Sequence, residues 1–201
     1  QRERREQGSN RALGIGVASY VEVTSGGGGS EYASLEIHDD GTATMKAGTS
    51  AHGQGHQTSF AMIVSELTGI PVENITLIQS DTDIVPRGGG TGGSRSLQLG
   101  GSAVKEATDA VISKAKDLTA HLLEASVDDI VVNNEQGTVG VAGVPATALS
   151  WGDLAAASKN EVPAGILDSE DGMEGLAAQL DFNQENGTFP FGTHISVVEV
   201  D

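Results

Sequence analysis

The sequence predicts an α+β fold with a mixed sheet and packed helices, for three reasons. Stretches with alternating apolar residues and stretches with apolar residues at helical spacing both occur along the 201 residues. They do not follow a strict strand–helix–strand rhythm, which argues against a doubly wound parallel sheet. The four Phe, two Tyr and one Trp are too few to fill a core, so Val, Ile, Leu and Ala must do so.

Charge and composition exclude several classes of protein. The net charge is −17, and so acidic a surface repels phosphates, which makes nucleic acids and anionic membranes poor partners. The chain has no cysteine, which excludes disulfides, thiolate metal sites and a cysteine nucleophile within it. No apolar run has the roughly eighteen residues that a membrane span needs, and the charged N-terminus does not resemble a signal peptide. We therefore expect a cytoplasmic protein.

The chain is expected to begin with a charged end and a strand. Residues 1–11 predict a charged N-terminal helix or a frayed end, and the α+β body occupies residues 12–201. Within the body, residues 12–23 alternate apolar and small side chains. This pattern predicts a strand that a neighbour packs closely.

A hairpin is expected next. The glycine run at residues 26–30 predicts a hairpin loop, with a disordered excursion as the alternative. Strands at residues 32–37 and 42–47 follow, joined by an Asp-Asp-Gly turn at residues 39–41.

The middle of the chain predicts two helices and one strand. Apolar side chains at helical spacing predict a helix over residues 58–68, which Gly69 terminates and Pro71 follows. Residues 72–78 predict a strand, and about residues 97–125 predict a long helix. The remaining predicted elements are a hairpin at 127–141, a helix at 151–158 capped by Ser150, a loop at 163–172, and strands at 173–182 and 194–200. The chain ends within the last strand pattern, so we expect a fragment of a larger subunit.

A glycine-rich segment between a predicted strand and a predicted helix is the first candidate site. It reads Gly-Thr-Ser-Ala-His-Gly-Gln-Gly-His-Gln-Thr over residues 48–58. Glycines let a ligand approach the backbone, and a helix start offers unpaired N–H groups with a partial positive charge. With polar side chains as additional donors, the segment predicts a cradle for an anion or a nucleotide. The candidate residues are Gly53, Gln54, Gly55, His56 and Thr58.

Two alternatives stay open for this segment. Gly53 and Gly55 could only make a tight turn, with Thr58 capping the helix, because the spacing matches neither a Walker loop nor a dinucleotide fingerprint. His52 and His56 are four residues apart and suggest a metal site. The glycines between them disfavour a helix with both rings on one face, and no third ligand is evident, so we predict no metal ligand here.

A second glycine-rich segment, residues 81–96, runs into the predicted long helix. Backbone N–H groups, hydroxyl groups and the guanidinium fork of Arg95 converge at a helix start, where they suit a phosphate or another oxyanion. Arg87 flanks the same run of glycines. The alternative is a flexible lid or a disordered tether with incidental arginines. The candidate residues are Thr91, Gly93, Ser94, Arg95 and Ser96.

Asp81 and Asp83 open the second segment and suggest a general acid and base. Two carboxylates two residues apart in a strand-to-loop turn are more often solvated or capping groups. We therefore predict no catalytic residue in this chain.

Four motifs occur in a fixed order: Gly-Thr-Ser-x-x-Gly-Gln-Gly-His-x-Thr at 48–58, Glu-Leu-Thr-Gly-Ile-Pro at 66–71, Asp-Thr-Asp at 81–83 and Gly-Ser-Arg-Ser at 93–96. In this order they resemble the molybdenum-binding part of the large catalytic subunits of the xanthine dehydrogenase and aldehyde oxidase family. The resemblance is strongest to the bacterial branch of aerobic carbon monoxide dehydrogenase-like subunits.

The resemblance implies a molybdopterin cofactor with molybdenum, present in the bacterial branch as its cytosine dinucleotide. The candidate residues of the first loop would hold one part of the pterin and pyrophosphate, and those of the second loop another part. The family hydroxylates a small-molecule substrate such as carbon monoxide, an aldehyde or a heteroaromatic compound. Electrons leave through iron–sulfur centres and FAD on other domains or subunits, which fits the absence of cysteine here.

The catalytic glutamate of the family lies well beyond residues 194–200, and its substrate loop lies upstream of residue 1. The resemblance therefore implies the remainder of the large subunit as a partner and an inactive isolated chain. Two other functions stay open. One is a cofactor-free binding or assembly module with degenerate loops, and the other is an independent nucleotide-binding protein.

Overall fold

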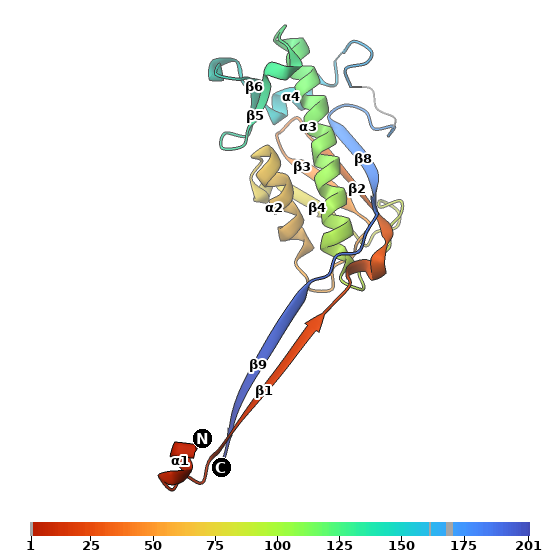
Figure 1. Cartoon of the computed structure of the whole chain (residues 1–201). Coiled ribbons are helices and arrows are strands. Elements are labelled where there is room, and N and C mark those ends of the chain that lie inside the picture. The colour runs from red at the N-terminus through yellow and green to blue at the C-terminus, as the bar shows by residue number, and fades with distance from the viewer. Residues whose placement is uncertain (1, 161, 168–170) are drawn as a thin grey trace.

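The structure consists of an α+β body and a long two-stranded ribbon that projects from it (Figure 1). The computed structural model describes residues 2–160, 162–167 and 171–201. The predicted α+β class with a mixed sheet is confirmed.

The body is built on a four-stranded sheet with the order β4-β3-β2-β8. Its strands are β2 (Gly29–Ile37), β3 (Ala43–Ala47), β4 (Ile75–Ile78) and β8 (Ala177–Gln184). The β2 strand pairs antiparallel with β3 and β8, whereas β3 pairs parallel with β4. The parallel pair needs a crossover between its strands, and this crossover carries the first glycine-rich loop.

Two helices pack on this sheet (Figure 1) and complete the main core. They are α2 (His56–Thr68) and α3 (Ser102–Leu122), and α3 continues from a π-helical segment at Ser96–Gly101. Side chains such as Phe60, Val111 and Leu118 are fully buried, and each contributes about 1.5–3 kcal/mol of transfer free energy to folding. A Cβ atom on Gly100 would lie 2.7 Å from the Thr49 side chain, so glycine lets the helix approach the first loop closely.

A small second sheet caps one end of the body. It has the order β5-β6-β7, with β5 (Ile130–Asn133), β6 (Thr138–Val141) and β7 (Leu149–Ser150), and α4 (Trp151–Ala157) follows. The predicted hairpin in this region and the predicted cap are both confirmed. Ser150 Oγ accepts a hydrogen bond from the Asp153 N–H at 3.1 Å, and the Asp153 carboxylate completes a capping box.

The ribbon pairs β1 (Ala12–Val21) with β9 (Phe191–Val200), two strands from opposite ends of the sequence. The short helix α1 (Arg2–Glu6) lies at its tip (Figure 1), so the predicted charged N-terminal helix is present. Side chains such as Ile15 and Val17 are each 66% exposed. The strand predicted at residues 12–23 is confirmed over Ala12–Val21, with β9 as its paired neighbour, but no close packing explains Gly16, where a Cβ atom would meet nothing within 4 Å.

The expected hairpin loop at 26–30 is also wrong. Residues Thr24–Gly27 form a 3₁₀ turn, and β1 and β2 belong to different sheets. Each residue of β1 pairs with a residue 170 or more positions further along the chain. A local sequence pattern carries no information on so distant a partner, and the glycine run between two strand patterns therefore favoured a hairpin.

Several element boundaries differ from prediction. The strand predicted at 72–78 begins only at Ile75, because residues Val72–Asn74 form a 3₁₀ turn in which the Asn74 N–H donates to the Pro71 carbonyl. The strand predicted at 173–182 begins at Ala177, and the loop predicted at 163–172 lies partly outside the described residues. Across the described part of the chain, every helix is too short or too polar to cross a membrane.

Candidate functional site

The first glycine-rich loop is open to solvent and leads into α2. Gly53 and Gly55 have φ angles of 110° and 75°, which favour glycine. A Cβ atom at either position would meet no atom within 4 Å. These glycines therefore serve backbone conformation, and the space beside them is free for a ligand. The side-chain oxygen of Gln54 accepts a hydrogen bond from the His52 N–H, which closes the loop.

The N-terminus of α2 has no side-chain cap. Its N-cap residue is Gly55, whose carbonyl accepts hydrogen bonds from the N–H groups of Thr58 at 3.1 Å and Ser59 at 3.0 Å. No side chain of the described residues accepts a cap hydrogen bond from the first turn. This turn thus presents N–H groups and a partial positive charge, the arrangement that binds anions. Thr58 is exposed inside the first turn, so the alternative that it caps the helix is wrong.

His56 is buried beneath the loop. It is 3% exposed, and its ring stacks on Phe60 with centroids 4.9 Å apart. Its Nδ1 lies 3.2 Å from Oε1 of Gln79, and this oxygen also accepts a hydrogen bond from the Ala51 N–H at 3.3 Å. An acceptor at Nδ1 assigns the ring proton to that atom. Nε2 is buried without a hydrogen-bond partner among the described residues.

The two histidines of the loop do not converge. His52 is exposed, whereas His56 is buried against Phe60. Within the described ranges, no three His, Asp or Glu side chains are grouped so that they could hold a metal ion.

The second glycine-rich loop is packed against the first. The Gly90 N–H donates to the Gly48 carbonyl at 3.2 Å. A Cβ atom on Gly88 would lie 2.3 Å from the Cα of Gly48, so both positions need glycine. The second loop therefore meets the first directly after β3, where the first loop leaves the sheet.

Hydroxyl groups line the contact between the loops. The Ser50 N–H donates to Thr91 Oγ1 at 3.3 Å, and Thr91 Oγ1 lies 2.9 Å from Ser96 Oγ. Ser50 Oγ lies 2.5 Å from Ser80 Oγ. Ser80 and Gln79 directly follow β4 and form a third segment of the site that the sequence analysis missed. Their only signal is a pair of polar residues after an apolar strand.

Gly93 and Ser94 join the second loop to the base of the ribbon. Their φ angles are 54° and 57°, and both residues are exposed. The Gly93 carbonyl accepts a hydrogen bond from the Ser25 N–H at 2.7 Å, and Ser94 Oγ donates to the Glu22 carboxylate.

Arg95 is engaged within the protein. Its guanidinium donates to the carbonyls of Ser30 at 2.7 Å and Gly89 at 3.3 Å, and its Nη2 lies 3.2 Å from the Glu31 carboxylate. An adjacent hollow of about 350 Å³ is lined by Glu31, Gly89 and Arg95, but Gln54 is not part of its lining. The two loops touch, but Gln54 and Arg95 do not share this hollow.

Arg87 is engaged in the same way. Its Nη2 lies 2.8 Å from the Asp181 carboxylate, and its guanidinium carbon lies 4.5 Å from the centre of the Tyr32 ring. The hydrogen bond from Arg87 to Asp181 raises the pKa of the Arg87 guanidinium above its usual value. Both arginines of the second loop are thus paired with carboxylates.

Asp81 and Asp83 form a turn. Asp81 Oδ1 accepts a hydrogen bond from the Asp83 N–H at 3.0 Å, and the Asp81 carbonyl accepts from the N–H groups of Ile84 and Val85. This is the capping role that the sequence analysis gave as the alternative to acid–base catalysis.

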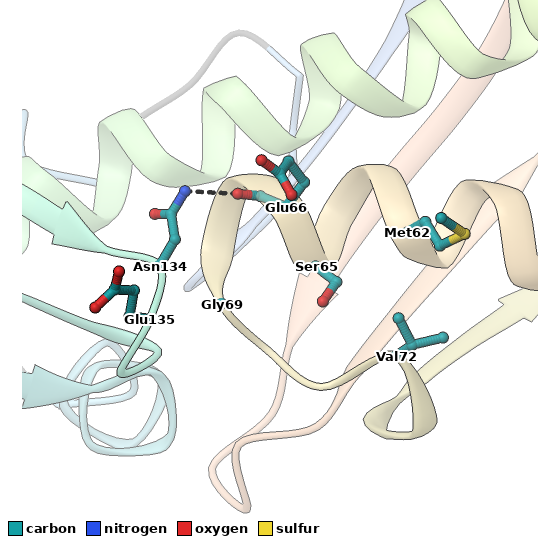
Figure 2. A pocket seen from close by; sticks show the side chains of 7 residues that line it. All are labelled: Met62, Ser65, Glu66, Gly69, Val72, Asn134 and Glu135. Carbon is teal, nitrogen blue, oxygen red and sulfur yellow. Dashed lines mark hydrogen bonds between the residues drawn. The ribbon is translucent and has the colours of Figure 1, made fainter.

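A hollow of about 490 Å³ lies at the other end of α2, against the turn after β5 (Figure 2). Asn134 Nδ2 donates to the Glu66 carbonyl at 2.5 Å across one side of it. Its lining contains the carboxylates of Glu66 and Glu135 and no basic side chain. This hollow does not suit an anion.

The fold and the loops together define an α+β domain that exposes an uncapped helix N-terminus and an open glycine-rich loop to solvent. The molybdopterin cofactor-binding domain family matches residues 1–201, and the chain belongs to this family.

Relatives of known identity agree with this assignment. The carbon monoxide dehydrogenase large chain of Hydrogenophaga pseudoflava is 33% identical over 98% of this chain and 26% of its own length. The nicotine 6-hydroxylase large subunit of Paenarthrobacter nicotinovorans is 30% identical over 100% of this chain and 25% of its own. Reconstituted CO dehydrogenase from Oligotropha carboxidovorans superposes with a TM-score of 0.85 at 30% identity, over 100% of this chain and 25% of that one. The chain thus spans about a quarter of the length of these relatives.

The residues of the first loop fit a phosphorylated cofactor. Open space surrounds Gly53 and Gly55, the first turn of α2 lacks a cap, and Nε2 of His56 is buried without a partner among the described residues. Unpaired donors and acceptors at one place are costly unless a ligand or water satisfies them.

Proposed function

We propose that this chain holds the phosphate part of a molybdopterin cofactor at the N-terminus of α2. The observation that carries the proposal is the first turn of α2, which begins at an open glycine and has no side-chain cap. Gln54 shapes this loop, Thr58 adds a hydroxyl donor, and the backbone at Gly53 and Gly55 permits close approach. His56 supports the loop from below, stacked on Phe60.

In this proposal the second loop contributes a neighbouring set of contacts. Thr91 and Ser96 supply hydroxyl groups, and Gly93 and Ser94 supply exposed backbone. Because Arg95 is already paired with Glu31, the phosphates are bound mainly by N–H and hydroxyl groups. The cytosine dinucleotide form of the cofactor belongs to the same proposal.

We further propose that the whole protein is a molybdenum-dependent hydroxylase of the class that includes carbon monoxide dehydrogenase. When bound, the cofactor supplies the redox chemistry of hydroxylation. Asp81 and Asp83 have no part in this chemistry in the proposal, since both are turn residues. The partners in this proposal are the remainder of a large subunit, iron–sulfur and FAD subunits and a small-molecule substrate, in the cytoplasm.

Equilibrium dialysis of the chain against cytidine 5′-diphosphate tests the proposed site, with Thr58→Asp and Thr58→Asn as matched variants. Aspartate in the first turn favours the helix but repels an anion placed there. We expect Thr58→Asp to lower the affinity at least about tenfold relative to Thr58→Asn, with no loss of stability. Equal affinities in the two variants, or no binding by the wild-type chain, would contradict the proposed site.

A further inference from the structure

A buried carboxylate lies beneath both glycine-rich loops. Glu31 belongs to β2 and is 1% exposed, whereas Glu36, further along the same strand, is exposed. Burying an ionised carboxylate is costly unless charged groups or N–H donors surround it. The position of Glu31 therefore requires specific partners.

The second loop supplies most of these partners. The Gly89 N–H donates to both carboxylate oxygens of Glu31, at 3.1 and 3.3 Å, and Arg95 Nη2 lies 3.2 Å from Oε2. The remaining donor is the Tyr32 N–H at 3.1 Å, on the same strand. One carboxylate thus ties two positions of the glycine-rich loop, 89 and 95, to the sheet.

The first loop packs on the same carboxylate. A Cβ atom on Gly48 would lie 2.1 Å from Oε1 of Glu31 and 2.5 Å from the Cα of Gly88. Glu31 therefore lies at the junction of the two loops, and the position of each loop depends on the other.

Arg95 is turned toward this junction. Besides Glu31, its guanidinium contacts the Ser30 and Gly89 carbonyls. Hydrogen bonds between charged partners are stronger than those between neutral ones, and a guanidinium can make several at once. An arginine used in this way fixes the loop, and Glu31 offsets its charge.

We propose that Glu31 is a positioning residue, which acts through Gly89 and Arg95 to hold the second loop against the first. Its contacts are a property of the protein alone, while its consequence for cofactor binding rests on the proposed function. In this arrangement Arg95 is a positioning residue as well.

Amide hydrogen exchange of the unliganded chain, followed by NMR, tests the contacts directly. Glu31→Gln preserves the size of the side chain but removes the charge that Gly89 and Arg95 contact. We expect exchange at residues 89–96 to become about tenfold faster, with α3 unchanged, and the Gly89 amide proton to move upfield. The control Glu36→Gln removes an exposed charge from the same strand and should leave both readouts as in the wild-type chain.

Rescue by a neutral pair separates positioning from general stability. Arg95→Gln alone leaves the buried charge of Glu31 without its cation and should also loosen the loop. The double variant Glu31→Gln/Arg95→Gln should restore part of the protection, because no buried charge is then unpaired. Protection in the double variant no better than in Arg95→Gln would count against the proposal.

Loop exchange in Glu31→Gln equal to that in Glu36→Gln would overturn the proposal. If Glu31→Gln does not fold, Glu31→Asp takes its place, because it keeps the charge but shortens the side chain. We expect the same increase in amide exchange rate in Glu31→Asp, confined to residues 89–96. A normal loop in Glu31→Asp would then overturn the proposal. Faster loop exchange in Glu31→Gln, together with no binding of cytidine 5′-diphosphate by the wild-type chain, would support positioning by Glu31 and refute the proposed function.

Discussion

The two glycine-rich loops have similar compositions but different structures. The first loop is exposed around Gly53 and Gly55, with free space beside both residues. The second loop is bonded to the sheet, because Glu31 of β2 contacts both Gly89 and Arg95. Glycine thus leaves open space at Gly53 and Gly55 and permits close packing of backbone where Gly48 of the first loop meets Gly88 of the second. Composition alone does not distinguish an open loop from one that is bonded to the sheet.

The largest effect is expected where glycine permits packing. Gly88→Ala would place a Cβ atom 2.3 Å from the Cα of Gly48. Neither backbone can move without displacing the junction over Glu31, so we expect the free energy of unfolding to fall by about 3 kcal/mol. Chemical denaturation followed by circular dichroism measures this change. Gly16→Ala is the control, because a Cβ atom there meets nothing within 4 Å.

A smaller loss is expected in the open loop. Gly53→Ala creates no clash, but its φ of 110° is unfavourable for alanine. We expect a cost of about 1–2 kcal/mol in the same denaturation experiment. A loss equal to that of Gly88→Ala would show that the two loops do not differ as described.

The smallest effect is a gain. Thr58→Asp places a carboxylate in the uncapped first turn of α2, where the helix dipole favours it. We expect the free energy of unfolding to rise by about 0.5 kcal/mol at low ionic strength and the gain to shrink with added salt. A loss of stability would show that the N–H groups of this turn are already satisfied.

The sequence predicted what depends on local pattern. The helix ending at Gly69, the hairpin turn at residues 39–41 and the Ser150 cap follow from spacing and turn chemistry, and the structure contains all three. The glycine-rich segments were correctly located between a strand and a helix.

Long-range pairing could not be predicted in the same way. The partner of β1 is β9, at the far end of the chain, so the local pattern wrongly favoured a hairpin at residues 26–30. Arg95 was predicted to bind a phosphate because the sequence does not show that it pairs with the buried Glu31, which lies 64 positions upstream. Gln79 and Ser80 join the site only because β4 pairs with β3.

The difference between the loops is tested most directly by an NMR titration of the chain with cytidine 5′-diphosphate. The proposed function predicts that amide shifts concentrate at residues 53–58, with small changes at Thr91 and Ser96 and almost none at Gly89. Shifts centred on Arg87 and Arg95, with residues 53–58 unaffected, would contradict it.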